Sequence, residues 1–116
     1  MTYDLEERTA LFGKNIIIFC KSLKKDIVAQ PLIVQLVRSG TSIGANYTEA
    51  NGASSKKDFR NKIFICKKEA HETRYWLKMI LNYLDKEDAL ASKLQKECQE
   101  LILIFQKIIS SLDKNK

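Results

Sequence analysis

The feature that most constrains the fold is an unbroken helical repeat in the second half of the chain. Apolar or small residues recur there at alternating steps of four and three: Phe59, Ile63, Cys66, Ala70, Thr73, Leu77, Ile80 and Leu84. Because an α-helix has about 3.6 residues per turn, these side chains fall on one stripe of a single long helix. Such a stripe is stable only when other helices cover it, so the repeat predicts a helical bundle.

Local signals place the start of this helix. Ser55, followed three residues later by Asp58, resembles a capping box. The pair comes directly after residues 51–54, a stretch that breaks helices. We therefore predict a helix over residues 55–84.

Three further segments show the same spacing, over about residues 5–24, 31–51 and 86–113. Pro31 suits the first position of a helix, where its missing N–H would have no partner in any case. Short connections, no strand-like alternation and no repeat of fixed period favour one all-α domain over residues 1–116. The predicted architecture is an antiparallel up-down-up-down four-helix bundle.

No segment of the chain resembles a membrane span or a signal peptide. The longest apolar runs are Ile16–Cys20 and Leu101–Phe105, far short of the roughly 20 residues that cross a bilayer. The start of the chain is acidic, whereas a signal peptide begins with basic residues. We expect a cytoplasmic protein without a membrane partner.

The three cysteines, Cys20, Cys66 and Cys98, are interpreted as reduced core residues. Their number is odd, no Cys-x-x-Cys spacing occurs, and each falls on or beside an apolar helical stripe. Neither a disulfide nor a metal site is predicted from them.

The candidate acid–base residues do not form a recognisable catalytic motif. Glu69 and Glu72 lie one turn apart on one helix face, an arrangement that can shift pKa values. A di-iron bundle needs Glu-x-x-His pairs on facing helices, and the single histidine, His71, is out of register for that motif. Gly40 and Gly44 are not followed by the Gly-Lys-Ser/Thr of a phosphate loop, and glycines four apart more often allow a neighbouring helix to approach closely. We predict a non-enzymatic protein with no metal and no cofactor.

Residues 35–51 offer an unusual outer face. Away from its apolar side, this segment carries mostly small or neutral polar groups, whereas an ordinary exposed helix carries dense Lys and Glu. We expect this face to be covered by a polar network, within or between subunits, in which a cation satisfies the carboxylates of the 55–84 helix. The predicted members are Arg38, Asn46, Glu49, Glu69 and Glu72.

A second stripe on the 55–84 helix predicts self-association. It is too apolar to be left in water, and it consists of Ile65, Glu69, Glu72, Trp76, Met79 and Tyr83. Residues 16–19 and 101–105 also point apolar groups all round, more than one four-helix core can absorb. We predict a homo-oligomer. Its interface is expected to contain Ile65, Trp76, Met79 and Tyr83, and the alternative is a monomeric bundle with an apolar surface.

A third face of the same helix is basic. Its cations recur about every turn, with Phe64 and His71 among them: Lys57, Arg60, Lys67, Lys68, Arg74 and Lys78. With a net charge of +6, the chain suits an acidic partner, and such a ladder could follow a phosphate backbone. No base-reading motif occurs, so binding would be driven by the backbone and only weakly sequence-specific. The alternative is an ordinary solvated face.

Two motifs carry a resemblance to a known family. The first is Arg-Ser-x-x-Ser-Ile-x-x-Asn-x-x-Glu at residues 38–49, and the second is Lys-Glu-Ala-x-Glu-Thr-x-Tyr-Trp-Leu at residues 68–77. In this order, and with Lys-Asp-Phe at 57–59 between them, they resemble the bacterial four-helix-bundle family encoded by intervening sequences within large-subunit ribosomal RNA genes. The resemblance covers nearly the whole chain.

The resemblance implies a four-helix bundle that assembles into a five-membered ring. The family is also distantly similar to the accessory variability protein of diversity-generating retroelements, a basic ring thought to bind nucleic acid and a reverse transcriptase. We therefore expect an oligomeric protein that binds nucleic acid, structured RNA above all, through its basic face. The alternative function is a structural adaptor whose covered face receives a protein partner.

Overall fold

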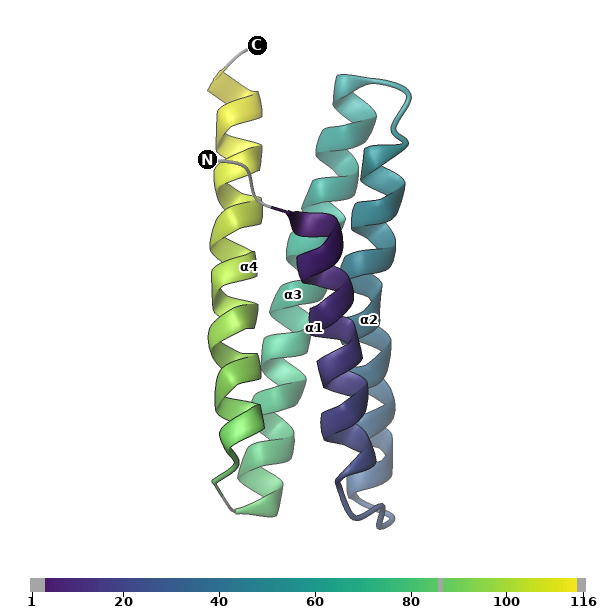
Figure 1. The fold of residues 1–116 in the computed structure, drawn as a ribbon, viewed down its shortest axis with the longest axis vertical. Helices are drawn as coiled ribbons and strands as arrows, with labels where there is room; N and C mark the ends of the chain where they lie inside the picture. The colour runs from purple at the N-terminus through teal and green to yellow at the C-terminus, as the bar shows by residue number, and fades with distance from the viewer. Residues whose placement is uncertain (1–3, 86, 115–116) are drawn as a thin grey trace.

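The computed structural model describes residues 4–85 and 87–114, and within them the chain forms four α-helices and no strand. The helices are α1 (Leu5–Lys21), α2 (Ala29–Asn51), α3 (Lys56–Leu84) and α4 (Ala89–Lys114). They lie side by side along the longest axis of a molecule of 48 × 23 × 20 Å (Figure 1). The α1–α2 and α3–α4 connections lie at one end and the α2–α3 connection at the other. The predicted all-α fold is confirmed; the ends of the predicted 1–116 domain, residues 1–3 and 115–116, lie outside the described residues.

The first two helices differ slightly from their predicted bounds. α1 ends three residues early, where the Ser22 hydroxyl donates to the Phe19 carbonyl at 2.6 Å. α2 begins two residues early, because the Asp26 carboxylate accepts from the N–H group of Ala29 at 2.8 Å. Pro31 is therefore the third residue of its helix and not the first, still within the turn whose N–H groups lack helical partners.

The last two helices begin at side-chain caps. Ser55 accepts from the N–H of Asp58 at 3.0 Å, as the sequence predicts. Asp88 accepts from the N–H of Ala91 at 3.0 Å, so α4 starts at Ala89; the predicted start at residue 86 lies outside the described residues. α3 ends at Leu84, and the capping residue Asp85 that follows has a left-handed φ of 50°, a conformation that Asp tolerates better than most residues.

The core consists of the predicted stripes. On α3 the buried residues are Ile63, Cys66, Ala70, Thr73, Leu77 and Ile80. They pack against α2 and α4, while α1 lies mainly on α2 and touches α4 least. A β-carbon added to Gly40 would lie 2.9 Å from Ile16, so α1 and α2 approach closely here, as the glycine spacing predicts.

The cysteines are buried and free. The Cys66 thiol contacts the Ile43 carbonyl at 3.6 Å, and the Cys98 thiol donates to the Ala70 carbonyl at 3.1 Å. Burial raises the pKa of each of these two thiols to about 12 and that of Cys20 to about 11. They are therefore protonated at neutral pH and chemically quiet.

The described part of the chain contains no helix with the length and apolar character needed to cross a membrane.

Candidate nucleic-acid interface

Three cations of α3 point toward α4 and are held there. Arg60 donates to both carboxylate oxygens of Asp113, at 2.7 and 3.0 Å. Lys67 Nζ donates to Gln106 Oε1 at 2.7 Å, and Arg74 Nη1 donates to Gln99 Oε1 at 2.6 Å. We call Arg60, Lys67 and Arg74 the seam row. Its members are seven residues apart, which places successive cations about 10 Å apart along the helix.

The partners within the seam row differ in charge. Asp113 neutralises Arg60, whereas the amides of Gln106 and Gln99 hold Lys67 and Arg74 without cancelling their charge. The Gln106 amide nitrogen also donates to Ser110 Oγ at 3.1 Å, which keeps the amide oxygen turned toward Lys67. Two cations of the row are thus oriented and yet left positive.

His71 completes this part of the surface as a neutral group. Its Nδ1 lies 3.2 Å from Arg74 Nη2. Burial, and then the positive charges of Arg74 and Lys67, lower its pKa below the ordinary value of 6.5. The imidazole is therefore uncharged at neutral pH and can accept a hydrogen bond from Arg74.

The other predicted basic residues, Lys57, Lys68 and Lys78, are exposed to solvent, and we call them the outer lysines. Three aromatic rings are exposed on the same helix, Phe64 at 48%, Tyr75 at 53% and Tyr83 at 42%. The Lys67 ammonium lies 5.3 Å from the centre of the Phe64 ring, within cation–π range. The single ladder predicted from sequence therefore divides into the seam row, which is held by α4, and the outer lysines, which are exposed to solvent.

α4 widens the positive surface in a way that sequence reasoning missed. Lys107 and Lys114 directly follow Gln106 and Asp113, and both lysines are exposed. Lys96, one turn before Gln99, is exposed as well. The lysines of α4 could be seen in the sequence, but which of them lie beside α3 depends on how the two helices align.

The predicted polar network is smaller than expected. Arg38 Nη1 donates to Glu69 at 3.2 Å and Arg38 Nη2 to Glu72 at 2.6 Å. The side chain of Glu69 is only 12% exposed, but that of Arg38 is 45% exposed, so the pair lies at the edge of the α2–α3 seam. Two carboxylates surround this one cation.

The other two predicted members of the network bond elsewhere. Asn46 donates to the Ser42 carbonyl of its own helix at 2.8 Å, and Glu49 accepts from Lys62 at 3.0 Å. The prediction that they join Arg38 was wrong, because both lie two or more turns further along α2 and face a different level of α3.

The predicted oligomer interface is half-covered by its own chain. Ile65, Trp76 and Met79 are half-buried, and Tyr83 is 42% exposed with its hydroxyl donating to Asp26 at 2.9 Å. Trp76 packs on the core, yet its buried Nε1 has no hydrogen-bond partner among the described residues. The Tyr75 ring meets the Trp76 ring edge to face, with centroids 4.9 Å apart.

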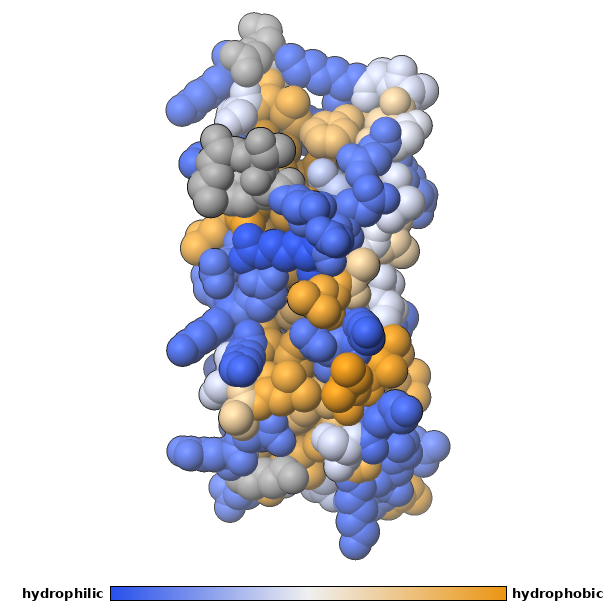
Figure 2. Space-filling view, in the orientation of Figure 1, coloured by the Kyte–Doolittle hydropathy of each residue, from blue (hydrophilic) through white to orange (hydrophobic). Residues whose placement is uncertain are grey.

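A second apolar surface lies along α1 and α2. A groove of about 540 Å³ between them is lined mainly by small and aliphatic residues, including Gly13, Ile17, Thr41, Gly44 and Ala45. Apolar side chains exposed on these helices are Leu11, Ile17, Ile18 and Val34. Figure 2 shows hydrophobic side chains gathered in the lower half of the face that α1 covers. The all-round apolar segment at residues 16–19 was the sequence signal for this surface.

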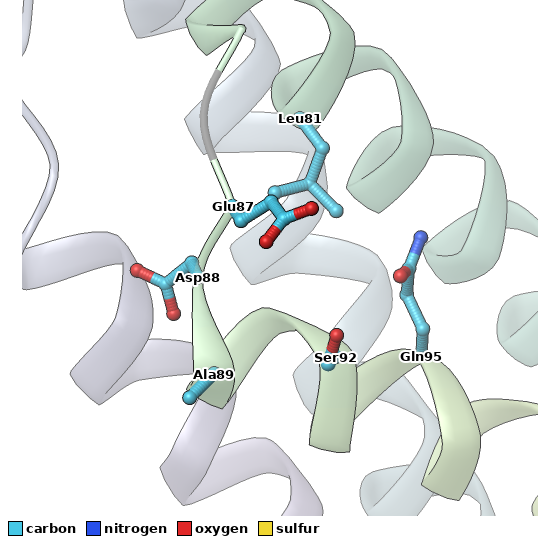
Figure 3. A pocket seen from close by; sticks show the side chains of 6 residues that line it. All are labelled: Leu81, Glu87, Asp88, Ala89, Ser92 and Gln95. Atoms are coloured by element: carbon cyan, nitrogen blue, oxygen red, sulfur yellow. The ribbon is translucent and has the colours of Figure 1, made fainter.

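A hollow of about 470 Å³ at the α3–α4 turn is lined by Leu81, Glu87, Asp88, Ala89, Ser92 and Gln95 (Figure 3). Asp88 is engaged in capping α4. Across residues 4–85 and 87–114, no three His, Cys, Asp or Glu side chains are grouped to hold a metal ion. We therefore interpret the hollow as part of the α3–α4 turn and not as a functional site.

Comparisons with known proteins agree with the motifs. The family model described as 23S rRNA-intervening sequence protein matches residues 3–107. A crystal structure of a protein of unknown function from the S23 ribosomal protein family of Bacteroides thetaiotaomicron is similar, with a TM-score of 0.79 and 31% sequence identity. The match covers 90% of this chain and 96% of that one. A comparison with curated proteins found no match.

Proposed function

The chain belongs to the 23S rRNA-intervening sequence protein family, and we propose that its α3–α4 surface binds nucleic acid, structured RNA above all. The observation that carries this proposal is the neutral pairing of Lys67 and Arg74. A cation that only joins two helices is normally matched by a carboxylate, which lowers the cost of holding it in place. Here Gln106 and Gln99 fix the position of the charge and leave it for a ligand.

A polyphosphate backbone suits such a surface. Cations about 10 Å apart on a straight helix, together with the exposed outer lysines, contact phosphates without reading bases. Affinity should therefore fall steeply with salt and vary little with sequence. The proposed role is non-enzymatic and cytoplasmic.

We also propose that copies of this up-down-up-down bundle assemble into a ring, with five copies favoured by the family resemblance. A head-to-tail ring needs two different faces on each subunit. The α1–α2 groove and the stripe around Trp76 are two such faces, and an acceptor from a neighbour would satisfy the Trp76 Nε1. A ring would repeat the basic surface and multiply a weak contact into useful avidity.

The competing function is a structural adaptor. In that case the α1–α2 groove receives a segment of another protein, and the basic surface only keeps the molecule soluble. The two functions differ in what removes the partner: nuclease treatment releases a nucleic acid, whereas a bound protein survives it.

The direct test is the double variant Lys67→Gln/Arg74→Gln, measured by RNA binding over a range of salt concentrations. We expect affinity for structured RNA to fall about tenfold or more and the slope of log affinity against log salt to decrease by about two. The matched control is Arg38→Gln, which removes a cation already neutralised by Glu69 and Glu72 and should leave binding unchanged. Light scattering should give the same mass for all three proteins. Wild-type protein that binds neither RNA nor DNA at low salt would exclude this function and favour the adaptor.

A further inference from the structure

We propose that the α3–α4 surface binds the unpaired segments of a nucleic acid, with bases stacked on Phe64 and Tyr75 and phosphates on Lys67 and Arg74. This inference rests on the proposed function and narrows its ligand class. Four described features support it: two exposed rings, the cation beside the Phe64 ring, the neutral histidine between the two rings, and the straight course of the helix.

The two rings lie on one face of α3. Phe64 and Tyr75 are eleven residues apart, close to three full turns, so they point the same way at a separation of about 16 Å. Each is about half exposed, and both lie among lysines and arginines. An aromatic face in water beside a fixed positive charge is the arrangement on which unpaired bases stack.

The Phe64 ring has a cation of the seam row next to it, whereas the Tyr75 ring lies about 100° around the helix from the nearest cation of that row, Arg74. Lys67 is shared between the Phe64 ring, at 5.3 Å from its centre, and the Gln106 amide oxygen, at 2.7 Å. Arg74 directly precedes Tyr75 in the chain and is fixed by Gln99. A nucleotide offers a flat base and an anionic phosphate joined through one sugar, so the Phe64–Lys67 pair matches one nucleotide. Tyr75 and Arg74 lie on adjacent faces and would hold a base and a neighbouring phosphate.

His71 lies between the two rings along the helix. It lies two turns after Phe64 and about one turn before Tyr75, on the same exposed face. Its Nδ1 contacts Arg74, so the imidazole is oriented, and its lowered pKa leaves it an uncharged ring. Three rings therefore alternate with cations along the helix, and together they form a continuous binding surface for a single-stranded nucleic acid.

A perfectly paired duplex cannot use these rings. Its bases are stacked inside the helix, and an A-form duplex has a major groove too deep and narrow for side chains to enter. A duplex would contact only the cations, whereas a loop, bulge or single-stranded end would add the stacking contacts. Structured RNA should thus be held at its unpaired positions.

The experiment compares three RNA probes at low salt: a stem-loop, a blunt duplex made from its stem, and an unstructured single strand. The variants are Phe64→Leu and Tyr75→Leu. Each should weaken binding of the single strand and the stem-loop about tenfold and leave binding of the duplex unchanged. The salt dependence should also stay unchanged, because no charge is removed. A DNA single strand of the same sequence should bind within a few-fold of the RNA strand, since stacking and phosphate contacts do not need the 2′-hydroxyl.

Three control variants separate ring loss from other effects. Phe64→Tyr and Tyr75→Phe keep the rings and should keep wild-type affinity. Ile27→Ala removes an apolar side chain that is 89% exposed in the α1–α2 connection, and it should have no effect.

The outcomes distinguish this inference from the proposed function. If the duplex binds as tightly as the single strand and the ring variants bind like wild type, the surface contacts phosphates only. The inference is then overturned, while the proposed function stands. If Phe64→Leu or Tyr75→Leu lowers the mass of the assembly, the rings belong to a subunit contact and the inference is again overturned. If no probe binds, the proposed function fails and this inference fails with it.

Discussion

Helix α3 meets polar partners on both of its flanks, and the flanks differ in how many of their cations are paired with carboxylates. On the α2 flank, Arg38 lies within 3.2 Å of Glu69 and 2.6 Å of Glu72, so two carboxylates surround one cation. On the α4 flank, Arg60 pairs with the carboxylate of Asp113, but α4 offers Lys67 and Arg74 amide oxygens. Below these surfaces the flanks are alike, because each buries one cysteine whose thiol contacts a carbonyl of the adjoining helix.

The difference separates a structural role for charge from a binding role. A matched ion pair at the edge of a seam orients two helices and leaves little field for a ligand. A cation held by an amide is equally well positioned but keeps its field. If this division holds, changes of charge on the two flanks should affect stability and binding separately.

The largest expected effect concerns what the flanks share, their buried thiols. Burial raises the pKa of Cys66 and of Cys98 from 9.0 to about 12, so the unfolded chain releases these protons at lower pH than the folded protein does. The stability contributed by the protonated thiols is therefore complete below pH 9 and is lost as the pH rises toward 12. At about pH 10.5 each thiol should have lowered the free energy of unfolding by about 2 kcal/mol.

Denaturant unfolding under reducing conditions, compared at about pH 8 and about pH 10.5, measures this loss. Cys66→Ala and Cys98→Ala should each reduce the loss by a similar amount. If one variant removes the whole pH-dependent loss of stability, the interiors of the two flanks differ, which contradicts the similarity described above.

The next effect in size is the removal of a cation from each flank. Arg38→Met keeps an apolar stem but leaves Glu69, 12% exposed, without its cation, and should lower the free energy of unfolding by about 1–2 kcal/mol. Arg74→Met should cost about 0.5 kcal/mol or less, because the Gln99 amide can turn to water. Urea denaturation at a fixed protein concentration distinguishes the two.

Adding Glu69→Gln and Glu72→Gln to Arg38→Met should recover part of the loss, since the unmatched charges are gone. Equal costs for Arg38→Met and Arg74→Met would mean that both cations serve the fold, which contradicts the proposed division of roles.

The smallest effect on stability is expected when the α4 flank is made to imitate the α2 flank. Gln106→Glu gives Lys67 a carboxylate partner and should raise the free energy of unfolding by about 0.5 kcal/mol at low salt. The same change should weaken RNA binding several-fold, because it cancels a charge that the proposed function uses. Asp113→Asn is the matched opposite: it removes the carboxylate that neutralises Arg60 and should strengthen binding. RNA affinity that follows stability in both variants would contradict the comparison.

Much of the fold could be predicted from local pattern. The stripe from Ile63 to Ile80 is buried as its spacing requires, and every helix end lies within three residues of its predicted position. The errors have local causes as well: Ser22 ends α1 and Asp26 starts α2 through side-chain hydrogen bonds that apolar spacing does not reveal. Apolar periodicity gives the buried face of a helix, and capping residues refine its ends.

The candidate site was only partly predictable. The basic face of α3 and the pairing of Arg38 with the two carboxylates of α3 could be stated from the sequence, since each depends on which residues share a helix face. The roles of Gln99, Gln106 and Asp113 could not. All three are unremarkable on α4 until the alignment of α3 with α4 brings them opposite the seam row.

The sequence by itself therefore determined the class of fold, the buried stripes and the family, because each depends on the spacing and order of residues along single helices. Only the tertiary structure decided which cations are neutralised, which are left positive, and that Asn46 and Glu49 bond away from Arg38. The physical reason is that charge depends on neighbours at a few ångströms. For helices that pack side by side, those neighbours are set by an alignment that arises from the packing of the whole core.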